Sequence, residues 1–118
     1  MQTINDLGSY TFQAMLSNTL TKFSDRPAVA FSNGTPITYA EVGSRIEDLK
    51  NRLYRLGVNP GDRVALFGAS SPNWGSCYFA IVSLGAIAVP LLPDFNVKEV
   101  DSCLRHSGAT ALIIAAKL

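Results

Sequence analysis

Hydroxyl and amide side chains that could contact a ligand are concentrated in residues 68–73, between an apolar run and an expected helix start. In open parallel sheets, ligands bind beyond the carboxyl ends of strands, and the amides of a following helix N-terminus favour an anion. A dinucleotide loop needs three glycines in register and a phosphate loop needs a lysine after its last glycine, and neither is present. The segment is interpreted as a capped strand-to-helix turn, with an auxiliary ligand-contacting loop as the alternative. The auxiliary substrate-binding residues would be Ser70, Ser71, Asn73 and Trp74.

Other patterns that could do chemistry receive structural interpretations. Residues 32–36 read Ser-Asn-Gly-Thr-Pro, but strand-like runs flank them and no lysine follows, which favours a hairpin turn over a phosphate-binding loop. His106, the single histidine, falls in the last turn of an expected helix with only Cys103 near it, which favours a structural role over metal binding or catalysis. The nucleophile elbow Gly-x-Ser-x-Gly is absent. We therefore predict no catalytic residue and no metal site within the chain.

Composition excludes several partners. The 118 residues carry ten Lys plus Arg and nine Asp plus Glu, a net charge of +1, which predicts neither nucleic-acid binding nor an anionic membrane surface as partner. The most apolar stretch, residues 77–92, is shorter than the ~20 residues that span a bilayer, so no transmembrane segment is expected. The N-terminus lacks a basic and apolar leader, and the two cysteines lie in apolar surroundings. We expect a cytoplasmic protein with two thiols rather than a disulfide.

The elements that must position these residues begin after a polar lead-in at residues 1–10. Apolar positions then recur at spacings of three and four, which predicts a helix from Thr11 to about Ser24. Short strands are expected at residues 28–31 and 37–39, joined by the hairpin turn. A capping box formed by Thr38 and Glu41 opens a second helix that ends at Gly57. Its buried face is expected to consist of Val42, Ile46, Leu49, Leu53 and Leu56.

Three apolar runs with helices between them follow, at residues 63–68, 87–92 and 110–116. Ser70 or Ser71 caps the first of these helices, which starts at Pro72, and Asn96 caps the second, which stops at Gly108. The second helix is expected to direct inward Val97, Val100, Cys103 and Leu104. Short connections between strand, helix and strand predict right-handed crossovers. The fold class is therefore α/β, one unit over residues 11–118 with a mainly parallel sheet, helices on both faces, an N-terminal helix and a short antiparallel hairpin.

The order of five segments resembles the opening of the adenylate-forming enzymes, the AMP-binding synthetases and ligases. The segments read Thr-Tyr-Ala-Glu at 38–41, Gly-Val-Asn-Pro-Gly-Asp-Arg-Val-Ala-Leu at 57–66, Ser-Pro-Asn-Trp and Gly-Ala-Ile-Ala-Val-Pro-Leu at 71–74 and 85–91, and Leu-Arg-His-Ser-Gly-Ala at 104–109. The resemblance covers residues 26 to 116. Its Ser-Pro-Asn-Trp segment is most similar to the long-chain fatty-acid–CoA ligases.

The resemblance implies an enzyme that uses ATP, Mg²⁺ and coenzyme A to convert a fatty or other carboxylic acid to an acyl-adenylate and then to an acyl-CoA. The family's lysine-bearing Ser/Thr/Gly-rich loop, magnesium-binding acidic residue, ribose-binding aspartate and late catalytic lysine have no counterpart among the residues printed. We therefore expect an inactive N-terminal portion that holds no cofactor by itself. Membrane-peripheral association of the full-length enzyme stays an open alternative.

Two other functions remain open. A small stand-alone α/β module could bind a nucleotide or a protein partner, and a purely structural interaction domain is the third hypothesis. Ligand titration discriminates between them, because a ligand that binds only the folded chain raises its melting temperature. If the chain is a truncated portion of the larger enzyme, the apolar strand from Leu112 to Ala116 predicts that it self-associates or exchanges an element through exposed sheet edges.

Overall fold

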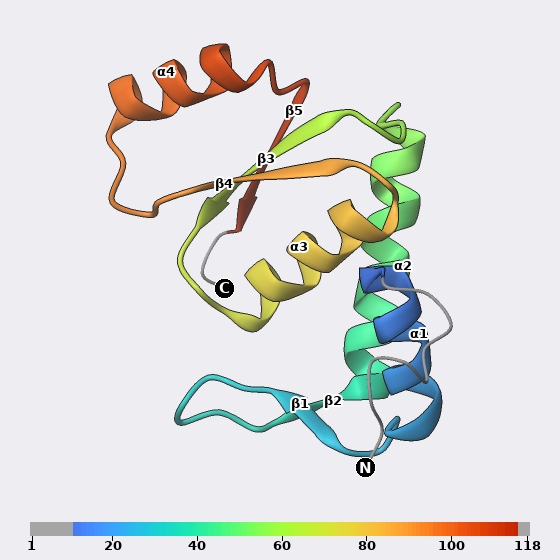
Figure 1. Ribbon diagram of the computed structural model, residues 1–118. Coiled ribbons are helices and arrows are strands. Elements are labelled where there is room, and N and C mark those ends of the chain that lie inside the picture. The colour runs from blue at the N-terminus through green and yellow to red at the C-terminus, as the bar shows by residue number, and fades with distance from the viewer. Residues whose placement is uncertain (1–10, 116–118) are drawn as a thin grey trace.

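The computed structural model describes residues 11–115 as four helices and two small sheets (Figure 1). The helices are α1 (Phe12–Lys22), α2 (Tyr39–Arg55), α3 (Pro72–Ser83) and α4 (Val97–Ser107). The strands are β1 (Pro27–Val29), β2 (Ile37–Thr38), β3 (Arg63–Gly68), β4 (Ile87–Leu91) and β5 (Ala111–Ala115). Strands β1 and β2 form an antiparallel hairpin, whereas β4, β3 and β5 form a parallel sheet in that order. The predicted α/β class is confirmed.

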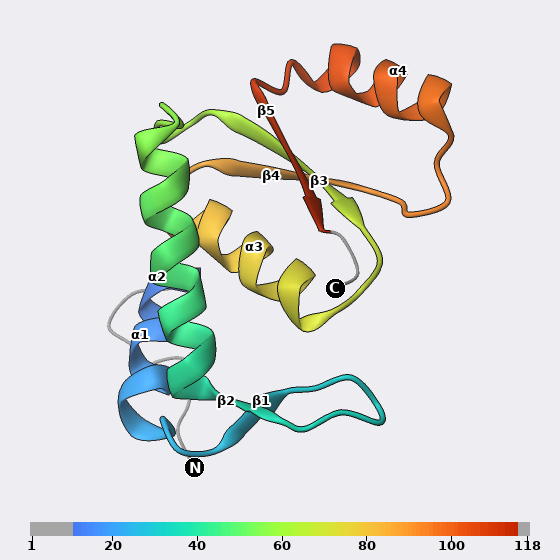
Figure 2. The ribbon, with the colours of Figure 1, turned by 180° about the vertical axis from the view of Figure 1, so that it is seen from behind.

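Strand β3 is the centre of the parallel sheet and of the core. Val64, Ala65 and Leu66 have no exposed surface, because β4 and β5 flank this strand and helices lie over both of its faces. Figures 1 and 2 show α3 on one face, beside α2, and α4 on the other. Ala80 and Ile81 of α3 are also fully buried. Helix α3 therefore packs on the sheet directly after the carboxyl end of β3.

Side-chain caps set where the helices begin. The Thr38 hydroxyl accepts a hydrogen bond from the Glu41 amide at 3.2 Å, as expected, but it also donates to Glu41 Oε1 at 3.3 Å. The full reciprocal capping box occurs instead at α4, where Asn96 Oδ1 accepts from the Glu99 amide and Glu99 Oε2 accepts from the Asn96 amide. Gly108 ends α4 in the left-handed conformation at φ +69°, so the predicted stop is confirmed.

Three expectations about burial are wrong. Leu56, placed on the buried face of the second helix, is 81% exposed because α2 ends at Arg55 and its periodicity no longer applies. Val97, expected to point inward, is 87% exposed at the first position of α4. The second and third apolar runs, expected to form buried strands, form the edge strands β4 and β5; Leu91 alone is buried in β4, and β5 alternates between half-buried and exposed residues. Thr110 also lies outside β5, and the expected strand residue 116 falls, with 117, 118 and 1–10, outside the described residues.

Helix α1 packs across α2 and α3 through aromatic and aliphatic contacts. Phe12 meets Tyr78 and Phe79 edge-on, with ring centroids 6.3 and 6.1 Å apart. Leu20 lies over Gly43 of α2, where a built Cβ would stand 3.0 Å from Leu20 Cδ2. Among residues 11–115, none of the helices is both long enough and apolar enough to cross a membrane.

Candidate functional site

The predicted loop at residues 68–73 borders a groove at the carboxyl end of β3. One wall of the groove is this loop and the other is the β1–β2 hairpin, whose tip extends below the N-terminal end of α3 in Figure 1. The groove has a volume of about 600 Å³ and is lined by Ala28, Val29, Ala30, Phe31, Ser32, Ser70, Ser71 and Pro72. Two segments distant in sequence thus form one concave surface at the position where parallel sheets bind ligands.

Ser70 and Ser71 both line this groove, but only Ser71 is part of the helix cap. Ser71 caps α3, and its hydroxyl oxygen accepts a hydrogen bond from the Trp74 amide at 3.1 Å. Its hydroxyl hydrogen can still be donated to an acceptor in the groove. Ser70 is exposed one residue earlier, before the cap. The two serines supply adjacent hydroxyl groups beside a helix N-terminus that has no acidic residue in its first turn.

Asn73 contributes to a different surface. It lines a cleft of about 220 Å³ between α2 and α3, together with Arg45, Asp48, Leu49, Arg52 and Ser76. Ser76 is only 3% exposed, and its hydroxyl donates a hydrogen bond to the Pro72 carbonyl at 2.9 Å. Ser76 therefore lies at the buried side of this cleft. Asn73 therefore does not join the two serines in the hairpin groove.

Trp74 belongs to the aromatic contacts of α3. Its ring stacks on that of Tyr78 with centroids 5.5 Å apart and an interplanar angle of 12°. The side chain is half-buried and packs against the main hydrophobic core. The structure thus places the four predicted residues in three surroundings and brings together only Ser70 and Ser71.

Sequence reasoning missed the contribution of the hairpin. The turn at residues 32–35 forms as expected, with the Gly34 amide donating to the Phe31 carbonyl at 2.9 Å. However, the same hairpin supplies the opposite wall of the groove, including Phe31, which is 56% exposed. A large aromatic residue directly before a polar turn was the available signal, since an exposed ring beside a loop is typical of a binding surface.

The two cysteines and His106 are the other side chains of residues 11–115 considered for chemistry. No three His, Cys, Asp or Glu side chains come together to hold a metal ion in this part of the chain. Cys77 and Cys103 are both thiols, and burial raises the pKa of Cys77. His106 is exposed near the end of α4.

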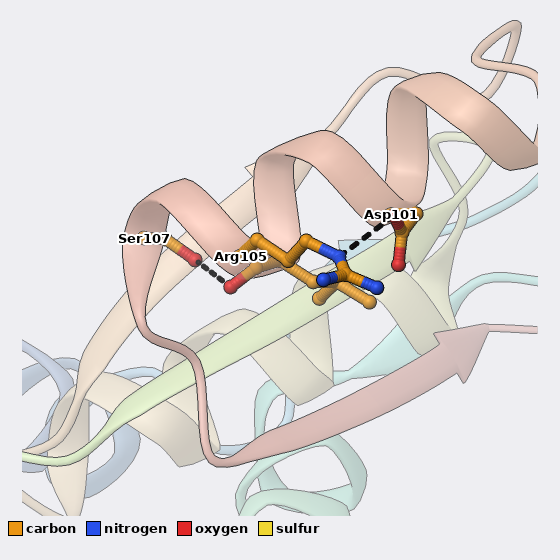
Figure 3. Close-up of polar contacts among 4 residues, drawn as sticks. Asp101, Arg105 and Ser107 are labelled. Atoms are coloured by element: carbon orange, nitrogen blue, oxygen red, sulfur yellow. Dashed lines mark hydrogen bonds and ion pairs between the residues drawn. The ribbon is translucent and has the colours of Figure 1, made fainter.

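Two polar side-chain contacts lie near the C-terminal end of α4 (Figure 3). Arg105 Nε donates to Asp101 Oδ2 at 2.9 Å, and the Ser107 hydroxyl donates to the Leu104 carbonyl at 3.3 Å. Both side chains of the Asp101–Arg105 pair are largely exposed, so the pair adds little stability. These contacts both lie within α4 and its last turn.

The chain is thus an α/β crossover unit with a groove at the end of its central strand, where open α/β sheets bind ligands. A family model described as "AMP-binding enzyme" matches residues 16–118, and the chain belongs to this family. The family and the order of segments that resemble adenylate-forming enzymes thus agree.

Known proteins show the same relationship. A feruloyl-CoA synthase from an Amycolatopsis species is 45% identical over 80 residues, which cover 68% of this chain and 16% of that protein. A long-chain-fatty-acid–CoA ligase of Mycobacterium bovis is 36% identical over 78 residues, covering 66% of this chain and 13% of that protein. The chain therefore spans less than a fifth of the length of either relative.

Solved structures reproduce the fold. The N-terminal subdomain of NpsA from Klebsiella oxytoca superposes with a TM-score of 0.81 at 25% identity, over 90% of this chain and 28% of that chain. The anthranilate CoA ligase AuaEII, solved with anthranoyl-AMP, superposes with a TM-score of 0.83 at 29% identity, over 96% of this chain and 22% of that chain. These relatives are named for different acids, including ferulate, anthranilate and long-chain fatty acids. Membership of the family therefore does not support the fatty-acid specificity expected from the Ser-Pro-Asn-Trp segment.

Proposed function

We propose that the chain is the N-terminal portion of an ATP-dependent carboxylate–CoA ligase, with residues 11–118 as a single α/β unit. In this reaction the carboxylate attacks the α-phosphorus of ATP and pyrophosphate leaves, and the thiol of coenzyme A then displaces AMP. The match of residues 16–118 to the AMP-binding family carries the proposal. The similarity to a feruloyl-CoA synthase and to the fold of an anthranilate CoA ligase supports coenzyme A as the acceptor.

The described residues supply scaffold and auxiliary contacts to this chemistry. Departure of pyrophosphate needs positive charge and hydrogen-bond donors aimed at the phosphates. Residues 11–115 hold no cluster of acidic residues suited to Mg²⁺, so this part of the chain does not fit a magnesium site and no step is assigned to one. The hydroxyl groups of Ser70 and Ser71 instead act as auxiliary donors in the hairpin groove, beside a ligand bound mainly by other residues.

The acid remains to be chosen between two classes. The Ser-Pro-Asn-Trp segment and the Mycobacterium bovis relative support a long-chain fatty acid. The feruloyl-CoA synthase has the higher identity of the two relatives, 45% against 36%, and supports an aromatic acid. We take an aromatic carboxylic acid as the substrate class to test first and a long-chain fatty acid as the second.

The test compares the 118-residue chain with the product of its complete reading frame. Each protein is incubated with ATP, Mg²⁺ and ferulate, anthranilate or palmitate, and both pyrophosphate release and hydroxamate formed by trapping with hydroxylamine are measured. We expect acid-dependent pyrophosphate release and, with coenzyme A, acyl-CoA from the complete product only. A complete product that activates none of these acids would overturn the ligase proposal.

The matched variants address the auxiliary role of the loop. Ser70→Ala in the complete product should raise the KM for at least one of the three substrates, ATP, the acid or coenzyme A. The expected rise is about 2- to 10-fold, the range for loss of one neutral hydrogen bond. Asn73→Ala, which alters the other cleft, serves as the control and should leave that KM unchanged. Equal effects of both substitutions would contradict the assignment of the hairpin groove.

A further inference from the structure

Gly68 ends β3 at the point where the chain leaves the sheet toward the hairpin groove. It pairs with Ala115, the last residue of β5, in a parallel ladder that starts at Val64 and Ala111. Its φ of +156° lies in a range that L side chains rarely adopt. Glycine is therefore the residue whose backbone makes this turn without strain.

A side chain at position 68 would also meet the neighbouring strand. A Cβ built on Gly68 stands 2.6 Å from the Ala115 carbonyl oxygen and 2.9 Å from the Ala115 Cβ, closer than real Cβ atoms approach. Side chains on a regular strand stand perpendicular to the sheet, whereas this Cβ would point toward the adjacent strand. The backbone angle and the close contact thus both require glycine at the end of β3.

The strand that Gly68 meets is held in place. All five residues of β5, Ala111 to Ala115, pair with β3. Helix α3 contacts this strand, and Ala115 is half-buried and packs against the hydrophobic core. Because the close contact is with the backbone of a paired strand, a side chain at position 68 would displace the loop after β3 rather than β5.

That loop is short and fixed at its far end. Only residues 69–71 connect Gly68 to α3, and the Ser71 hydroxyl caps the helix by accepting from the Trp74 amide at 3.1 Å. Ser70 lies between these two anchors and is exposed at the hairpin groove. The position of its hydroxyl group therefore depends on the angle at which the chain leaves Gly68.

We propose that Gly68 is a positioning residue for the hairpin groove. By letting β3 turn against Ala115, it sets where the Ser70 hydroxyl stands beside a bound substrate. This inference rests on the proposed function, in which Ser70 donates to a ligand in the groove. Gly68 is not among the residues that line the groove, so it acts through Ser70. Loss of the glycine should weaken binding as loss of the Ser70 hydroxyl does, and the two losses should not add.

The kinetic test is a double-mutant cycle in the complete product, with KM measured for ATP, the activated acid and coenzyme A. Gly68→Ala should raise about 2- to 10-fold the same KM that Ser70→Ala raises, and should change kcat by less than ~2-fold. Adding Ser70→Ala to Gly68→Ala should raise that KM by no more than a further ~2-fold. A glycine with a purely structural role predicts the opposite, since Ser70→Ala would then keep its full effect in the Gly68→Ala protein. That result, or an unchanged KM in Gly68→Ala, would overturn the proposal.

Gly61→Ala is the matched control. Gly61 precedes the amino end of the same strand and has a φ of +86°, but a Cβ built there meets nothing within 4 Å. Alanine at this position costs stability through its backbone angle, so this variant should melt earlier and leave each KM unchanged. A rise in the same KM equal to that of Gly68→Ala would assign the effect to lost stability and contradict the positioning role.

A second variant covers the case in which Gly68→Ala does not fold. Ala115→Val crowds the same contact from β5 and leaves glycine at position 68, so the backbone angle of the turn keeps its natural residue. We expect it to raise the same KM, again with no full additional effect of Ser70→Ala. An Ala115→Val protein with the KM of the wild type would count against the proposal.

Crystal structures of the complete product separate this proposal from the ligase function. In Gly68→Ala, or in Ala115→Val if that is the variant that folds, the Ser70 hydroxyl oxygen should move by at least ~0.5 Å, enough to take a hydrogen bond out of its normal distance range. The Ala115 carbonyl should stay in place. A displaced β5 with Ser70 unmoved would overturn the proposal whether or not the protein activates an acid. An inactive protein in which Ser70 has moved would instead refute the ligase function and leave the positioning role standing.

Discussion

A pair of helix glycines allows packing to be separated from backbone preference. Gly75 in α3 and Gly43 in α2 both lie inside helices, where alanine is favoured over glycine by roughly 0.5–1 kcal/mol. A Cβ built at Gly75 meets nothing within 4 Å, so Gly75→Ala should raise the free energy of unfolding by about that amount. For a domain of this size, this corresponds to a rise in Tm of about 2–5 °C.

At Gly43 the same substitution meets a neighbour. The built Cβ lies 3.0 Å from Leu20 Cδ2 and 3.1 Å from Leu20 Cδ1, closer than side chains ordinarily approach. Displacing Leu20 costs about 1 kcal/mol or more, which offsets the helical gain. Gly43→Ala should therefore be at least ~1 kcal/mol less stable than Gly75→Ala. If Leu20 is shortened to alanine, the alanine at position 43 should regain its full benefit.

The assay is urea unfolding followed by circular dichroism, at a concentration where a single species sediments. The double-mutant cycle of Leu20→Ala and Gly43→Ala isolates the coupling between the two positions. We expect a coupling free energy of about 1 kcal/mol, with Leu20→Ala relieving the contact. A coupling near zero, or a Gly75→Ala chain less stable than the wild type, would refute this reasoning about α1 and α2.

Three further predictions concern the cap, the core and the thiols. Thr38→Ala should lower the free energy of unfolding by about 1 kcal/mol in urea, because the Glu41 amide loses its acceptor, while Thr35→Ala in the exposed hairpin turn should change it little. Ile81→Ala should lower the free energy of unfolding by about 2–5 kcal/mol, because the side chain is fully buried. Leu56→Ala, at an 81% exposed site, should change it by no more than ~0.5 kcal/mol, and both values are read from the same titrations. Burial raises the pKa of the Cys77 thiol in the folded state above its value in the unfolded state. The protonated thiol therefore contributes stability that is complete below the unfolded pKa and is lost as pH rises through the folded pKa. Cys77→Ala should weaken this loss of stability at alkaline pH, measured as Tm against pH.

Element starts could be predicted from the sequence because their signals are local. Thr38, Ser71 and Asn96 each accept from an amide in the first helical turn, and such a cap is visible as a residue type at a fixed spacing. Burial at element ends could not be predicted, since the apolar period of α2 includes Leu56 although the helix ends one residue earlier. An apolar run such as β5 reads the same whether one face or both are covered.

The candidate site was only partly predictable, for a related reason. The position of Ser70 and Ser71 follows from strand–loop–helix order, which adjacent residues reveal. Their meeting with Phe31 depends on how the hairpin packs below α3, a long-range contact that no local pattern contains. Trp74 has a residue type suited to ligand binding, but its stacking on Tyr78 arises from helical spacing within α3.

The central place of β3 has a consequence for how the chain folds as it is synthesised. This strand leaves the ribosome before either of its neighbours, and the contact between Thr110 and Arg63 joins residues 47 positions apart. Closing loops of this length before any pairing is gained slows folding. Until β5 has been made, one edge of β3 has no partner strand, which makes β3 the segment where a chaperone should bind during translation.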